Sequence, residues 1–293
     1  MHPLIERLLA EGPMLTDGAW GTQMQARGLA VGGCPDEWNL TRPQTVEEIP
    51  RAYVEAGSQI VLTNTFRANR VTLADYGLAD QAEAINRAGA EISRRAVGDR
   101  AHVFASMGPS GRMLMMGEVS EPQLLDAFGE QARALAAGGS HGIVIETMGD
   151  LAEARLAVQG AKTTGLPVVA CLCFDSGAVL DRTLMGTTPE QAAQELTDAG
   201  ADVIGANCGQ GIAGYVAICR RLRAATERPI WVKPNAGIPE LVNDVPVWRT
   251  APEEFGNYGP ALVEAGASFI GGCCGTAPDF IRALRAAIRK VQA

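Results

Sequence analysis

The sequence predicts a (β/α)8 barrel formed by one domain over residues 1–293. Three observations support this prediction. Short apolar runs alternate with helical patterns eight times along the chain, and 47% of the residues are hydrophobic, which is enough for one large core. In addition, one local pattern recurs: a small residue and a glycine, a few apolar residues, and then a polar cluster. This pattern is typical of a helix that ends at a glycine and leads into a buried strand.

The strands are expected where these apolar runs lie. Four segments carry the recurring pattern: EAGSQIVLTNTF (55–66), AGGSHGIVIETM (137–148), DAGADVIGANC (198–208) and EAGASFIGGCC (264–274). Four more runs are PMLTDG (13–18), HVFASMG (102–108), PVVACLCF (167–174) and PIWVKPNAG (229–237).

Helices are expected between the strands. The helical patterns cover 45–56, 81–97, 121–137, 150–163, 188–199, 215–225, 251–265 and 277–291, and Pro50 should interrupt the first of them. The first residues, MHPLIERLLAEGP, predict a further short amphipathic helix and not a secretory signal. A doubly wound sheet is less favoured, because DGAWGTQ (17–23) is not the dinucleotide fingerprint G-x-G-x-x-G.

Charge and composition exclude several classes of function. The net charge of −8 argues against binding to nucleic acid or to an anionic membrane surface. No run of about 18 apolar residues is present, so no transmembrane helix is expected. Seven cysteines without framework spacing indicate a cytoplasmic protein with free or metal-bound thiols.

In a barrel, the active site lies at the carboxyl ends of the strands. Cys208 ends the sixth predicted strand, and Cys273 and Cys274 end the eighth. Three converging thiolates suit Zn²⁺ and leave its fourth position open, as in catalytic zinc sites. The alternatives are buried structural thiols, a vicinal redox disulfide, and a glycine-rich phosphate loop, which has no use for two thiols.

Three charged residues also fall at strand ends. Glu146 closes an apolar strand, which is costly unless a cation meets it; a loop arginine would suffice. Asp17 precedes a glycine and is either functional or a turn residue. Lys233 is interpreted as a member of an ion pair, with a Schiff-base lysine as the alternative. The remaining cysteines are interpreted as structural, and Cys34 has no assignable role.

Together, these residues resemble a known family. LTDGAWGTQMQARGL, PDEWNLTRP, AGSQIVLTNTF, IVIETM, GANCGQG, KPNAGIPE and GGCCGT are similar to segments of the homocysteine S-methyltransferase family. The resemblance runs from about residue 13 to 290. It implies an enzyme that transfers a methyl group to the thiol of homocysteine and so makes methionine.

The resemblance also implies roles for individual residues. Zinc would be bound by Cys208, Cys273 and Cys274, and homocysteine would enter as the fourth ligand. The side-chain oxygen of Asn235 would take that position when substrate is absent. The remaining implied residues hold the amino-acid end of homocysteine: Glu146 on its ammonium, the Asp17, Gly18 and Ala19 turn on its carboxylate, and Asn207 and Thr147 as further candidates.

The methyl donor is left open. The resemblance allows betaine, S-methylmethionine or a methyl-corrinoid. An onium donor would favour aromatic neighbours, for which the candidates are Trp20, Trp38, Phe66 and Phe174. The chain stops after the eighth predicted helix, so no corrinoid or folate module is expected in it. It would then be either an enzyme that acts alone or a methyl-acceptor subunit that needs a corrinoid protein as partner.

The alternative function from another class is a barrel lyase or aldolase. Such an enzyme would use Lys233 and the glycine-rich loop on a phosphorylated substrate.

Overall fold

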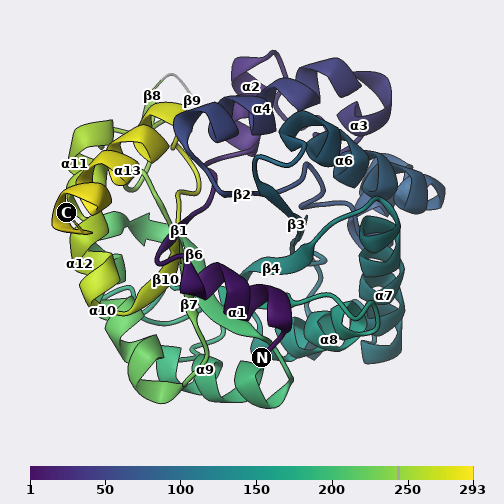
Figure 1. Ribbon diagram of the computed structural model, residues 1–293. Coiled ribbons are helices and arrows are strands. Elements are labelled where there is room, and N and C mark those ends of the chain that lie inside the picture. The colour runs from purple at the N-terminus through teal and green to yellow at the C-terminus, as the bar shows by residue number, and fades with distance from the viewer. Residues whose placement is uncertain (243–244, 293) are drawn as a thin grey trace.

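A computed structural model describes residues 1–242 and 245–292, and a parallel eight-stranded sheet forms its centre (Figure 1). The strand order is β1-β10-β7-β6-β5-β4-β3-β2, and every neighbouring pair in this order is parallel. The two ends of the sheet also meet, because the Gln59 N–H donates to the Leu15 carbonyl at 2.8 Å. Helices enclose the ring, so the predicted (β/α)8 barrel is confirmed.

The elements have the following bounds. The barrel strands are β1 (Met14–Leu15), β2 (Ile60–Val61), β3 (His102–Met107), β4 (Gly142–Met148), β5 (Val168–Leu172), β6 (Val203–Gly211), β7 (Ile230–Asn235) and β10 (Ala267–Ile270). The α-helices are α1 (Pro3–Ala10), α2 (Gly21–Ala26), α3 (Trp38–Thr41), α4 (Pro43–Ala56), α5 (Arg70–Leu73), α6 (Ala82–Val97), α7 (Glu121–Ala137), α8 (Leu151–Lys162), α9 (Pro189–Asp198), α10 (Ile212–Ala225), α11 (Pro252–Asn257), α12 (Gly259–Glu264) and α13 (Pro278–Gln292). Short 3₁₀ turns cover Ala74–Tyr76, Ala79–Gln81 and Leu114–Met116, and a small hairpin pairs β8 (Glu240–Val242) with β9 (Val245–Val247).

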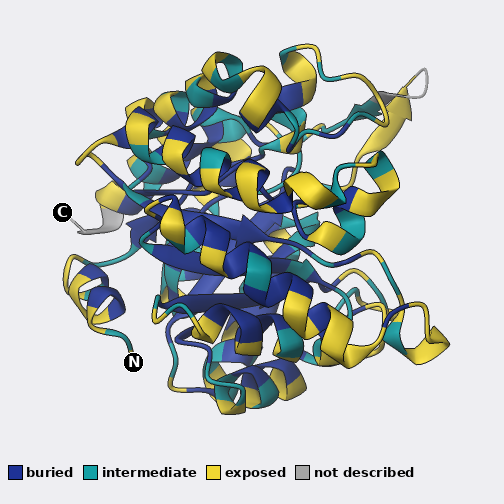
Figure 2. Ribbon diagram, turned by 90° about the vertical axis from the view of Figure 1, so that its right-hand side faces the viewer, coloured by how far each residue is buried: buried dark blue, intermediate teal, exposed yellow. Residues whose placement is uncertain are grey.

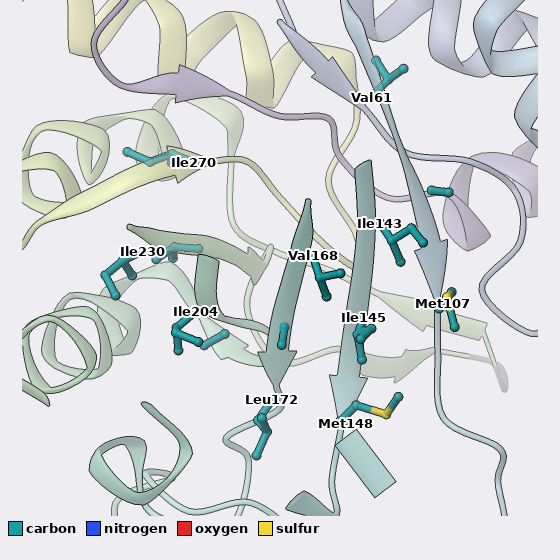
Figure 3. Close-up of a cluster of buried hydrophobic side chains, with 14 of the residues drawn as sticks. Val61, Met107, Ile143, Ile145, Met148, Val168, Leu172, Ile204, Ile230 and Ile270 are labelled. Atoms are coloured by element: carbon teal, nitrogen blue, oxygen red, sulfur yellow. The ribbon is translucent and has the colours of Figure 1, made fainter. Parts of the chain in front are cut away.

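The larger hydrophobic core lies between the strands and the surrounding helices. Figure 3 shows part of it, with side chains such as Ile143, Ile145 and Met148 on the outer face of β4. The helices bury one face against these side chains and expose the other (Figure 2). Alternation along each strand sends the intervening side chains into the barrel.

A second core fills the barrel itself. Trp231 lies between two phenylalanines there, with its ring 6.1 Å from that of Phe104 and 5.3 Å from that of Phe269. Helix α1 adds Leu4, Ile5 and Leu8 to the same cluster and lies across one end of the ring (Figure 1). The predicted amphipathic N-terminal helix therefore closes the end of the barrel opposite the carboxyl ends of the strands.

The recurring glycine has the expected conformation. Gly57, Gly139, Gly200 and Gly266 all have positive φ angles between a helix and the following strand. This conformation costs glycine little and reverses the chain direction. The local pattern that predicted four of the strands is therefore confirmed.

Three expectations about the elements were wrong or incomplete. Helix α4 runs through Pro50, because burial of residues such as Ile49 and Tyr53 offsets the hydrogen bond that proline removes. The helix expected over 251–265 is two helices, α11 and α12, which break at Tyr258 before Pro260. The β8–β9 hairpin was not predicted. Over the described part of the chain, no helix has the length and apolar character needed to cross a membrane.

Candidate metal centre and substrate cavity

Three cysteine thiols converge at the carboxyl ends of the strands. Cys208 belongs to β6, and Cys273 and Cys274 follow β10, with β7 between these two strands. Their Sγ atoms all lie within 4.8 Å of one another, and Cys208 Sγ is 3.9 Å from Cys274 Sγ. A tetrahedral zinc with bonds of about 2.3 Å would separate its sulfur ligands by about 3.8 Å. The spacing of the three thiols is therefore compatible with a tetrahedral metal ion such as zinc.

Neighbouring backbone holds the vicinal pair in place. The Cys273 N–H donates to the Pro234 carbonyl at 2.7 Å, and the Ala236 N–H donates to the Cys274 carbonyl at 2.9 Å. Gly271 passes so close to β1 that an added Cβ would overlap Thr16 Oγ1. The glycines before Cys273 thus allow two strand ends to approach each other closely.

Hydrogen bonds within the cluster shift the pKa values of the three thiols in opposite directions. Hydrogen bonds from the thiols of Cys173, Cys273 and Cys274 lower the pKa of Cys208. The hydrogen bond to Cys208 raises the pKa of Cys273, and it raises that of Cys274 to about 12. A metal ion bound here would displace these shared protons.

Asn235 has one free polar atom beside this cluster. Its Nδ2 donates to the Gly209 carbonyl at 2.7 Å, next to Cys208 in the chain. Its Oδ1 is buried, and no donor among the described residues reaches it. A buried amide oxygen without a partner is costly, and a cation would satisfy it. Asn235 Oδ1 is therefore a candidate for a further ligand beside the three thiols.

Glu146 lies at the end of β4 and is 8% exposed. The Ser106 hydroxyl donates to Glu146 Oε1 at 2.5 Å, and Asn207 Nδ2 lies 3.4 Å from Oε2. Burial raises the pKa of Glu146, although the Lys233 charge and the Ser106 hydrogen bond oppose the shift. No arginine of the described chain forms a salt bridge with it, so the loop arginine considered above is absent.

Asp17 and Lys233 form a buried ion pair. Lys233 Nζ lies 2.5 Å from Asp17 Oδ1, and these side chains are 2% and 0% exposed. Asp17 Oδ2 accepts the Leu62 N–H at 2.7 Å and Trp20 Nε1 at 2.9 Å. Burial disfavours the charge on Lys233, but Asp17 and Glu146 outweigh that effect and raise its pKa. A protonated lysine is no nucleophile, so this arrangement argues against the Schiff-base alternative.

These groups share one cavity of about 420 Å³. Of the predicted site residues, Gly18, Ala19, Glu146, Thr147, Cys208, Cys273 and Cys274 line it. The cavity is also lined by Lys233, Trp20 and Phe66. It is not lined by Asp17, Asn207 or Asn235. Trp38 and Phe174 are buried in the core, so only two of the four aromatic candidates could meet a donor here.

Comparison with known proteins identifies the family of this chain. The family model described as homocysteine S-methyltransferase matches residues 14–288. The chain belongs to the homocysteine S-methyltransferase family.

Relatives of this family member include much longer proteins. The chain is 33% identical over 304 residues to the methionine synthase of Mycobacterium tuberculosis, which covers 97% of this chain and 25% of that protein. The methionine synthase of Mycobacterium leprae is 33% identical over 301 residues, and this match covers 96% of this chain and 25% of that protein. The chain thus spans about a quarter of these relatives.

Solved structures share the fold of this methyltransferase-family chain. The metallated form of the homocysteine methyltransferase MmuM from Escherichia coli matches with a TM-score of 0.81. It is 24% identical, and the match covers 97% of this chain and 99% of that chain. The oxidized form of the same protein matches with a TM-score of 0.80 at 23% identity, over 96% and 98% of the two chains.

The sequence did not predict several features around the cavity and the three thiols. Ser106 was visible as a polar residue at a strand end, but nothing indicated that it would donate to Glu146. Cys173 is buried, as expected of a packing residue, yet its thiol also donates to Asp175 Oδ2 at 3.5 Å. An adjoining cavity of about 370 Å³ shares Thr147 and was not foreseen, because two long loops form it.

Proposed function

We propose that this chain transfers a methyl group to the sulfur of L-homocysteine and so forms L-methionine. Membership of the homocysteine S-methyltransferase family supports this reaction. The observation that carries the proposal is a cavity of about 420 Å³ that is lined both by three clustered thiols and by the charged residues Glu146 and Lys233. Homocysteine has a thiol and a charged amino-acid group, which are the groups that these two kinds of lining residue would bind.

The proposed cofactor is Zn²⁺, which Cys208, Cys273 and Cys274 would hold, with Asn235 Oδ1 as the candidate fourth ligand in the absence of substrate. The thiol distances and the unpaired amide oxygen support this assignment. A free thiol with a pKa of about 8.5 is only a few per cent thiolate at pH 7. Bound zinc would supply a deprotonated substrate sulfur at neutral pH and hold it in place for attack on the methyl group.

The chain's own residues would then orient the amino-acid end. We assign the ammonium of homocysteine to Glu146, whose Oε2 makes a single contact within the described residues, at 3.4 Å from Asn207 Nδ2. Asn207 and Thr147 would hold Glu146 in position. The Ala19 N–H already donates to Thr276 Oγ1 at 3.1 Å, so within this turn the Gly18 N–H, whose residue lines the cavity, is the candidate amide for a carboxylate.

Two kinds of methyl donor remain within this proposal. An onium compound such as betaine or S-methylmethionine would lie against Trp20 and Phe66, which line the cavity. A methyl-corrinoid would instead arrive on a partner protein. The much greater length of the methionine synthase relatives supports that second donor, as do exposed apolar side chains beside the adjoining cavity: Met113, Met115, Leu184 and Met185.

Methionine formation by zinc-loaded protein tests the proposal. Homocysteine would be offered with glycine betaine, S-methylmethionine or methylcobalamin in separate reactions, and zinc content would be measured on the same sample. Turnover with one donor supports the reaction and identifies the donor. Silence with all three small donors, but turnover once a methyl-corrinoid protein is added, assigns the chain as an acceptor subunit. Silence in every arm would contradict the proposed function.

Single cysteine variants test the metal site separately. Cys208→Ala, Cys273→Ala and Cys274→Ala should each lose zinc and activity while the barrel still folds. Cys219→Ala is the matched control, because Cys219 is a buried thiol on α10 whose sulfur contacts the Ala265 carbonyl. Stoichiometric zinc in all three site variants would overturn the assignment.

A further inference from the structure

Lys233 is a buried lysine that lines the substrate cavity. Its side chain is 2% exposed, and fully buried lysines are rare in proteins unless they are paired. It extends from β7 into the same cavity that Gly18, Glu146 and the thiols line. Its partner Asp17 does not line this cavity. Lys233 thus carries the positive charge of the pair to the cavity wall.

The ion pair leaves part of Lys233 unused. A lysine ammonium has three N–H donors and no acceptor. Within residues 1–242 and 245–292, Asp17 Oδ1 is the one acceptor found for them. Asp17 Oδ2 is already committed to Leu62 and Trp20. The remaining Lys233 donors therefore need an acceptor that the described part of the chain does not provide.

Glu146 offers the opposite charge in the same space. One of its oxygens accepts the Ser106 hydroxyl, and the other makes only a long contact with Asn207. The cavity wall thus presents one incompletely bonded cation and one incompletely bonded anion. An amino-acid zwitterion carries the complementary pair, a carboxylate and an ammonium.

We infer that Lys233 binds the α-carboxylate of the acceptor amino acid, while Glu146 binds its ammonium. Asp17 is then a positioning residue, which fixes Lys233 from behind the cavity wall. This inference rests on the proposed function, since it concerns how the same acceptor is held. It replaces the turn at Asp17, Gly18 and Ala19 as the principal carboxylate site.

Two truncated acceptors separate the roles of the charges. 3-Aminopropane-1-thiol is homocysteine without its carboxylate, and 4-mercaptobutyrate is homocysteine without its ammonium. The kcat and KM of each would be measured with a donor that the wild type uses. Calorimetric binding of each thiol to the zinc-loaded protein would give a second readout that needs no turnover.

The wild type should favour homocysteine over 3-aminopropane-1-thiol by about tenfold to a hundredfold, as expected for one hydrogen bond to a charged group. Lys233→Met should raise the KM for homocysteine by a similar factor and leave that for 3-aminopropane-1-thiol nearly unchanged. Glu146→Gln is the matched control. It should lose the preference over 4-mercaptobutyrate and keep the preference over 3-aminopropane-1-thiol.

The outcomes distinguish this inference from the function on which it rests. If the wild type methylates homocysteine and Lys233→Met still prefers it over 3-aminopropane-1-thiol, the lysine is structural and the inference fails alone. If the wild type neither binds nor methylates homocysteine, both fail. If Lys233→Met does not fold, the double variant Asp17→Asn/Lys233→Met removes both buried charges. Its preference for homocysteine over 3-aminopropane-1-thiol would then be measured in the same way.

Discussion

Asn207 and Thr147 form two hydrogen bonds with each other across β5, although they belong to β6 and β4. The Thr147 N–H donates to Asn207 Oδ1 at 2.6 Å, and Asn207 Nδ2 donates to Thr147 Oγ1 at 2.7 Å. Thr147 has a φ of 62°, which is unusual for a β-branched residue. Strain of this kind costs on the order of 1–3 kcal/mol and persists only where neighbouring groups enforce it. The pair therefore fixes the backbone directly after Glu146.

Replacing Asn207 by alanine should affect both stability and substrate binding. The Asn207→Ala variant leaves the Thr147 N–H without its acceptor, which should cost about 1–3 kcal/mol of unfolding free energy. The KM for homocysteine should rise, because Glu146 loses its fixed position. Urea unfolding and steady-state kinetics would measure the two effects. A KM that is unchanged in Asn207→Ala would make the pair purely structural.

Much of the fold was predictable because it depends on local patterns. A glycine with positive φ, such as Gly57 or Gly266, ends a helix wherever a buried strand must follow. The barrel then places all strand ends on one face, which is why Cys208, Cys273 and Cys274 could be grouped from the sequence. Membership of the family, found independently of these patterns, confirms the fold and the resemblance.

The remainder depends on contacts between residues far apart in the chain. Lys233 and Asp17 are separated by 216 positions, and nothing in either segment identifies the other as its partner. Trp38 follows a loop in the sequence yet is buried, with the Arg42 guanidinium 4.5 Å from its ring centre. Helix α4 continues through Pro50 for a similar reason, because packing of its apolar face outweighs a local preference.

Close packing at Gly271 should make this position intolerant of any side chain. An added Cβ would overlap Thr16 Oγ1 and lie 2.5 Å from the Asp17 carbonyl oxygen, which is backbone and cannot rotate away. Gly271→Ala should therefore destabilise the barrel by about 1–3 kcal/mol, as overpacking does, and weaken zinc binding at Cys273. Gly21→Ala is the control, since its Cβ would meet nothing within 4 Å. Thermal unfolding and zinc titration compare them; equal stability of both variants would contradict the packing argument.

Zinc should stabilise the folded chain through the three thiols. A ligand that binds only the folded state adds about 2.7 kcal/mol at a concentration one hundred times its Kd, which corresponds to a Tm increase of several degrees. We expect this increase in chelator-treated, reduced wild type after zinc is restored. It should be absent in Cys273→Ser and retained in Cys219→Ala. A Tm increase of equal size in Cys273→Ser would place the stabilising metal elsewhere.

His141 should make the stability pH-dependent at the other end of the barrel. Its Nδ1 accepts the Val103 N–H at 3.0 Å, and burial together with the Arg94 charge and His102 lowers its pKa from 6.5 to about 4. The unfolded chain therefore binds a proton at this residue below pH 6.5, whereas the folded chain does so only near pH 4. The stability contributed by neutral His141 is complete above pH 6.5 and is lost as the pH falls toward 4.

A variant that cannot titrate isolates this contribution. His141→Asn offers an amide oxygen to the Val103 N–H but binds no proton, so its unfolding free energy should fall less than that of the wild type as the pH drops from 6.5 to 4. Urea unfolding at several pH values would measure the difference between the two proteins. His102, whose ring centre lies 5.1 Å away and whose pKa is also lowered by burial, acts in the same direction and remains in both. A difference that stays constant with pH would mean that His141 stabilises the barrel only by packing.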